Sequence, residues 1–139
     1  MFRRYPLLGA LLIAYFAASL VHFIHNAEHL ASYPGLPSSW TRGGVYSAWL
    51  GMTAVGACGW LVLTRGIAII GLALLAIYAC LGLDSLAHYV LARFVDHSVA
   101  MNVTIVAEVS AAALVLCEVV RQAASTIAAR RPRRPSPAR

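Results

Sequence analysis

Lysine is absent from this chain, and charged residues of any kind are scarce. All eleven basic residues are arginine, five residues are acidic, and charged residues make up 12% of the 139 positions. A soluble domain of this size carries roughly a quarter charged residues. Because 60% of the residues are hydrophobic instead, the composition excludes an ordinary soluble domain and indicates an integral membrane protein.

Long polar segments are also missing. Four apolar windows, at about 6–31, 44–64, 67–92 and 98–120, are each long enough to cross about 30 Å of hydrocarbon as a helix, which takes about 20 residues. Little remains outside them except the loop 32–43 and the C-terminal segment. The sequence therefore predicts an all-α domain over 1–121, an up-down bundle of four transmembrane helices with no room for a soluble catalytic domain.

Cysteine is rare and has no motif. Cys58, Cys80 and Cys117 fall one in each of the last three windows, and no two of them have the short spacing of a metal knuckle or a redox pair. Their expected role is that of small apolar residues.

The segment 122–139 is rich in arginine and proline. It has no interleaved aromatic residues and no binding fold beside it, so nucleic acid is not an expected partner. We expect a disordered cytoplasmic tail near anionic lipid head groups.

Arginine placement predicts the orientation. With the N-terminus inside, nine arginines lie on the cytoplasmic side and only Arg42 and Arg93 lie outside. We therefore expect both termini in the cytoplasm, in a plasma membrane of the bacterial type. An N-terminal signal peptide cleaved near Ala17–Ser19 is the alternative, but the apolar run continues towards Leu30 and favours a retained first span.

A polar stripe interrupts the end of the first window. His22, His25, Asn26 and His29 stand at i, i+3, i+4 and i+7, which places them on one helix face roughly 100° wide. Ionisable groups in a membrane helix are costly and indicate a functional site.

Three more polar residues are predicted at a similar depth. In the up-down arrangement His22 lies roughly 24 Å, and Asp84 roughly 25 Å, from the inner ends of their helices. His88 lies near the outer surface, and Glu108 roughly 15 Å below it. The sequence thus predicts a polar cluster in the outer half of the membrane. His97 is expected to be solvated in a loop, where Arg93 and Asp96 form a local pair.

Imidazole and carboxylate groups projected from facing helices are how helical bundles build metal sites. We predict a site for Zn, Cu or Fe with ligands drawn from His25, His29, Asp84 and His88, with His22 and Asn26 as additional ligands or supporting residues, and Glu108 as a candidate proton acceptor.

Three functions follow from this pattern. The leading hypothesis is a membrane-embedded metalloenzyme acting on a lipid-soluble or small apolar substrate. The first alternative is a non-enzymatic accessory subunit, or a metal or proton transport component, of a larger membrane complex or homo-oligomer. The second is a haem-b electron-transfer protein, with His88 and a histidine of the first span as axial ligands.

Overall fold

The computed structural model describes residues 4–129, and in that range every regular element is a helix. The long elements are α1 (Pro6–Glu28), α2 (Arg42–Thr64), α3 (Ala68–Leu83) and α5 (Val99–Ala129). A 3₁₀ turn, η2 (Asp84–Ala87), joins α3 to the short α4 (His88–Leu91), so that Ala68–Leu91 forms one span. These four segments are each long and apolar enough to cross a membrane, which confirms the predicted all-α architecture.

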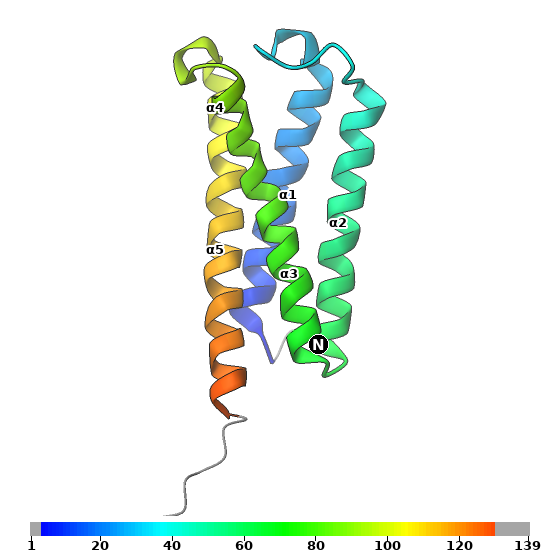
Figure 1. Cartoon of the computed structure of the whole chain (residues 1–139), viewed down its shortest axis with the longest axis vertical. Coiled ribbons are helices and arrows are strands. Elements are labelled where there is room, and N and C mark those ends of the chain that lie inside the picture. Colours follow the sequence, from blue (N-terminus) through cyan, green and yellow to red (C-terminus); the bar gives the residue numbers. More distant parts are fainter. Residues whose placement is uncertain (1–3, 130–139) are drawn as a thin grey trace, which may run out of the picture.

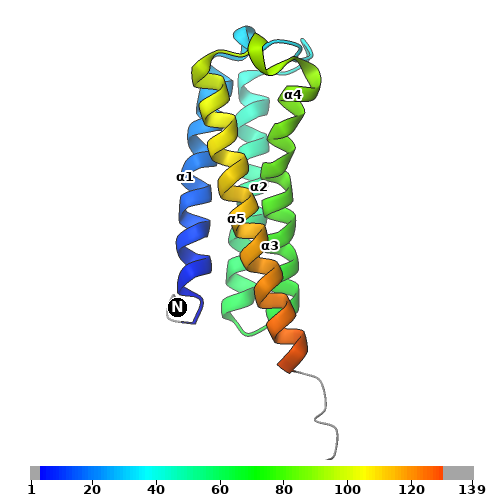
Figure 2. The same cartoon turned by 90° about the vertical axis from the view of Figure 1, so that its left-hand side faces the viewer.

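The helices form an up-down bundle (Figures 1 and 2). α1 packs against α2 and α5, and α3 packs against the same two helices. The turn between α2 and α3 lies at the end of the bundle where α1 begins and α5 finishes (Figure 1). The loops 29–41 and 92–98 lie together at the opposite end (Figure 2), which we call the loop end.

The helix boundaries differ from the predicted ones for local reasons. α1 finishes at Glu28 rather than at 31, because the chain tightens into the 3₁₀ turn Leu30–Ser32. α2 begins two residues early because the Thr41 side chain accepts a hydrogen bond from Gly44 N at 3.0 Å and caps the helix. α5 runs past the predicted end at 120 to Ala129, so residues 122–129 are helical instead of part of a tail. The rest of that segment lies outside the described residues.

Two glycines shape the junction of α2 and α3, one in the turn and one at the helix contact. Gly66 has φ +93° and reverses the chain between α2 and α3. At Gly71 an added Cβ would stand 2.5 Å from Leu63 N, so α3 approaches the backbone of α2 as closely as sterics permit. Leu8, Leu75 and Val115 are fully buried in this half of the core, and Glu118, which pairs with Arg121, is a buried ionisable residue there.

The orientation in the membrane remains a prediction and is testable by labelling. In a variant with all three cysteines replaced by alanine, we expect Ser38→Cys, in the loop 29–41, to react with an impermeant maleimide on intact cells. Ser125→Cys, on the last turns of α5, should react only after lysis. The reverse pattern would place both termini outside.

Candidate functional site

Polar side chains from three helical spans and one loop meet inside the loop end of the bundle. We call them the polar cluster; its members are His22, Asn26, Tyr33, Ser85, His88, Thr104 and Glu108. The gathering of His22, Asn26, His88 and Glu108 at one end of the bundle agrees with the depths predicted for them. Tyr33, Ser85 and Thr104 were not predicted.

The buried centre of the cluster is the pair His22 and Glu108. His22 is 1% exposed and Glu108 is 0% exposed, and Nε2 of the histidine lies 3.7 Å from Oε2 of the glutamate. Ser85 donates a hydrogen bond of 2.6 Å to the same carboxylate oxygen. Oε1 of Glu108 has no hydrogen-bond partner among the described residues. A fully buried carboxyl group with this little support is expensive to keep charged.

The hydrogen bonds around Thr104 fix the tautomer of His22. The Thr104 hydroxyl donates to the Met101 carbonyl oxygen at 3.0 Å, and a hydroxyl has one hydrogen to give. Its oxygen therefore accepts from Nδ1 of His22, which lies 3.2 Å away. Neutral His22 then carries its hydrogen on Nδ1 and turns the Nε2 lone pair towards Glu108. One proton, held by the carboxyl or by Nε2, would lie between these two groups, whose 3.7 Å separation is longer than a hydrogen bond.

Tyr33 closes the cluster from the loop side. It follows the turn at the end of α1 and is 4% exposed, with its ring 5.0 Å from that of His88. Its hydroxyl lies 2.9 Å from Nδ1 of His25. Burial raises the pKa of Tyr33 to about 12. At neutral pH Tyr33 is therefore a neutral phenol.

His88 is held by α1 and by the second loop. Asn26 Nδ2 lies 3.3 Å from Nε2 of His88, while Nδ1 of that ring has no partner among the described residues. His97 packs against it with 6.2 Å between the ring centroids. The prediction that His97 is solvated is wrong, because the loop folds back over α4 and leaves this residue 6% exposed.

The predicted metal ligands do not assemble. His29 and Asp84 are exposed, His25 is half-buried, and only His88 lies inside. Nowhere in residues 4–129 do three histidine, cysteine, aspartate or glutamate side chains form a group that could hold a metal ion. The reason lies in η2. Residues four apart are about 40° apart on an α-helix but about 120° apart on a 3₁₀ helix, so the turn Asp84–Ala87 leaves Asp84 exposed where His88 is buried, although both border one cavity.

For two of the polar-cluster residues that were not predicted, the sequence contains a weak signal. Ser85 adjoins Asp84, and Thr104 precedes Glu108 by one helical turn, on the same face. Tyr33 carried no such signal, because a tyrosine in a loop next to a membrane span is typical of the head-group region.

The loop 92–98 contains an exposed ion pair, as predicted. Arg93 donates to Asp96 at 2.9 and 3.0 Å, and these bonds hold the pKa of Asp96 below its usual value. Stabilisation by the pair is therefore present above the unfolded-state pKa and is lost as the pH falls through the lower folded-state pKa. We expect Asp96→Asn to reduce the thermal midpoint slightly at pH 7 and not at pH 2. An equal reduction at both values would contradict this.

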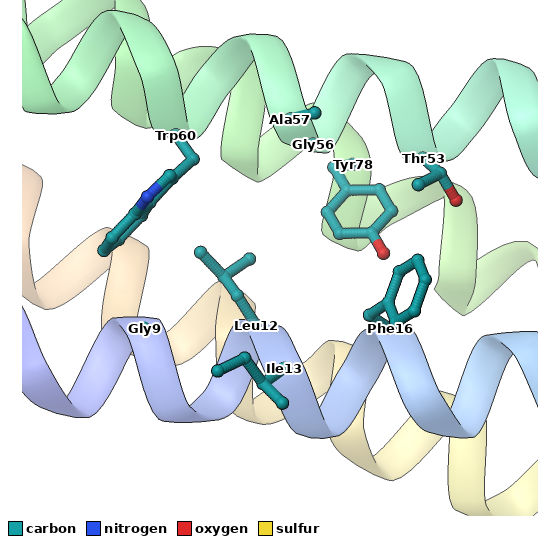
Figure 3. Close-up of a pocket in the computed structure, with 9 residues that line it drawn as sticks. All are labelled: Gly9, Leu12, Ile13, Phe16, Thr53, Gly56, Ala57, Trp60 and Tyr78. Atoms are coloured by element: carbon teal, nitrogen blue, oxygen red, sulfur yellow. The ribbon is translucent and has the colours of Figure 1, made fainter. Parts of the chain in front are cut away.

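Two cavities lie beside the bundle core. One, of about 230 Å³, borders the polar cluster between α1, the loop 29–41 and the turn η2. The other, of about 330 Å³, lies between α1 and α2 and has an almost wholly apolar lining (Figure 3). In Figure 3, Leu12 and Trp60 line one end of it, and Phe16, Thr53 and Tyr78 the other. Only the first cavity has access to the ionisable residues of the cluster.

Comparison with protein families, with curated proteins and with solved structures finds no match to this chain.

Proposed function

We propose that this chain is an integral membrane protein that takes up a proton on the buried pair of His22 and Glu108, and that it serves as a proton-transfer component of a membrane assembly. The observation that carries the proposal is the 3.7 Å separation of Nε2 and Oε2 within a pair that is at most 1% exposed. An acid and a base that share one proton in an apolar interior form a proton-exchange site.

Histidine and tyrosine rings lie between the pair and the loop end, and in the described residues no hydrogen bond joins Tyr33 to His22. His29 is exposed, and its ring lies 4.7 Å from that of His25. His25 contacts the hydroxyl of Tyr33, whose ring lies 6.4 Å from His22. Each of these side chains can give and accept a proton through a hydrogen bond, directly or through water.

Beyond Glu108 the buried positions are mainly apolar. Ala112 and Val115 follow on α5, while the buried Tyr78 on α3 and the buried Glu118, which pairs with Arg121 near the far end of α5, are the polar exceptions. This arrangement supports proton exchange with one side of the membrane rather than conduction by a single copy. It favours the first alternative that the sequence indicated, an accessory or transport component, over the metalloenzyme hypothesis.

Infrared difference spectroscopy on the detergent-purified protein tests the proposal. Acidification should produce the carbonyl band of a protonated carboxyl group in an apolar environment. Glu108→Gln should remove that band, and His22→Gln should shift the pH at which it appears. Glu28→Gln is the control, because Glu28 is exposed and pairs with Arg42 at 2.6 Å. A band that survives Glu108→Gln would overturn the proposal.

The metal and haem hypotheses are tested on the same sample. Elemental analysis and an absorption spectrum, without added metal, should show neither a stoichiometric transition metal nor a Soret band. About one equivalent of Zn, Cu or Fe would instead support the metalloenzyme hypothesis. A haem would support the electron-transfer hypothesis.

A further inference from the structure

The cavity beside the polar cluster has a mixed lining. Its polar lining residues are His22, Asn26, Asp84, Ser85 and His88. Its other lining residues are apolar or aromatic and include Phe23 and Trp40. At about 230 Å³ the cavity is smaller than the roughly 300–1,000 Å³ of sites for drug-sized ligands. Any occupant is therefore small and has both a polar and an apolar part.

Two buried polar atoms of residues that line the cavity have no hydrogen-bond partner among the described residues. The bond between Asn26 and His88 uses one atom of each side chain and leaves Oδ1 of the asparagine and Nδ1 of the histidine unpaired. If the Asn26 amide is flipped, its oxygen accepts from Nε2 of His88 instead. One donor and one acceptor of the two side chains are then still unpaired. His88 is 8% exposed, so little water reaches it, and a buried unpaired group of this kind indicates a missing ligand or an ordered water.

The charge at this site is negative. Asp84 borders the cavity and has no hydrogen bond or ion pair recorded among the described residues. The two arginines at the loop end are both engaged, Arg42 with Glu28 and Arg93 with Asp96. Within residues 4–129, no unpaired arginine at this end balances Asp84, which favours a positively charged occupant and disfavours an anion.

The aromatic lining residues suit an organic cation. Trp40 and Phe23 can present ring faces and edges to an alkylammonium group, and cation–π attraction is strongest for tryptophan. A bare metal ion would make no favourable contact with the aromatic lining residues Phe23 and Trp40. It would also need more protein ligands than the site offers, since no group of three metal-binding residues forms here in the described chain.

We propose that the cavity binds a small primary amine in its ammonium form, with the N–H groups directed to Asp84 and to the free acceptor of the Asn26–His88 pair, and with the carbon chain against Trp40. The inference rests on the proposed function in one respect. A ligand bound here lies next to His22, which borders the cavity and pairs with Glu108 in the proposed proton exchange.

Calorimetric titration of the full chain in detergent with n-butylammonium chloride tests the binding. We expect saturable binding that weakens about tenfold or more in Asp84→Asn, a loss of about 1.4 kcal/mol or more. Asp96→Asn is the matched control, because it removes an acid at the same end that is already paired with Arg93; it should bind as the unaltered protein does. The neutral isostere n-pentanol should bind much more weakly.

The outcomes separate this inference from the proposed function. Asp84→Asn should lose amine binding and keep the infrared band of Glu108, whereas Glu108→Gln should lose the band and keep most of the binding. Equal binding of n-pentanol, or binding unchanged by Asp84→Asn, would overturn the amine proposal. A third result would also overturn the amine proposal: the protein does not bind the amine but binds Zn²⁺ in a manner that depends on Asp84. That result would support a metal site.

Discussion

Replacing Gly71 with alanine is expected to destabilise the bundle by about 1–3 kcal/mol, the usual range for overpacking. The new Cβ would stand 2.5 Å from the amide nitrogen of Leu63 and 2.6 Å from its Cα. A side chain can rotate away from such a clash, but the backbone of α2 cannot, so α2 and α3 must separate. The free energy of unfolding, followed by circular dichroism against the mole fraction of dodecyl sulfate in mixed micelles, measures the loss.

Gly51→Ala is the matched control. Gly51 lies on α2 as well, but a Cβ there would meet no atom within 4 Å. Because alanine is the better helix former by roughly 0.8–1.0 kcal/mol, this variant should be as stable as the unaltered protein or more so. Equal losses in the two variants would show that the contact between α2 and α3 is looser than described.

Glu108→Ala is expected to cost about 2–5 kcal/mol, from the cavity that it leaves and from the partners that it orphans. Ser85 would lose the acceptor of its 2.6 Å hydrogen bond, and Nε2 of His22 would face an empty space. The same dodecyl sulfate titration measures the effect.

Glu108→Gln keeps the shape of the side chain but removes its ability to exchange a proton. The glutamine oxygen can accept from Ser85 in the place of Oε2, so this hydrogen bond and the side-chain volume are kept, although Nε2 of His22 faces the same oxygen and gains no donor. We expect stability within about 1 kcal/mol of the unaltered protein. If the alanine variant were as stable as the glutamine variant, the contacts of Glu108 would contribute nothing to the fold.

Hydropathy predicted the fold well because the four helices need only length and apolar content to be recognised. Its errors lie where local hydrogen bonding decides the boundary, as at the Thr41 cap. α5 shows a second kind of error. Its last turns contain Gln122, Ser125 and Thr126, whose polarity resembles a tail, although Thr126 donates to the Gln122 carbonyl oxygen within the helix at 2.8 Å.

The candidate site was predictable only in part. Depth along the helices brought His22, His88 and Glu108 together correctly, because depth depends on residue number alone. The direction in which a side chain points from its helix axis depends also on the type of helix. The 3₁₀ turn at Asp84–Ala87 therefore changed the direction of Asp84 relative to His88. Tyr33 enters the cluster through the path of a loop, which no periodicity describes.

The length of α5 has an electrostatic consequence. Its 31 residues span roughly 46 Å, well beyond about 30 Å of hydrocarbon. Ala129 lies eight residues past Arg121, or roughly 12 Å along the helix axis. That exceeds the Debye length of about 8 Å at physiological ionic strength. If α5 stands upright with Arg121 at the head groups, the end of the helix at Ala129 lies more than one Debye length from them, where salt has largely screened the field of anionic lipids.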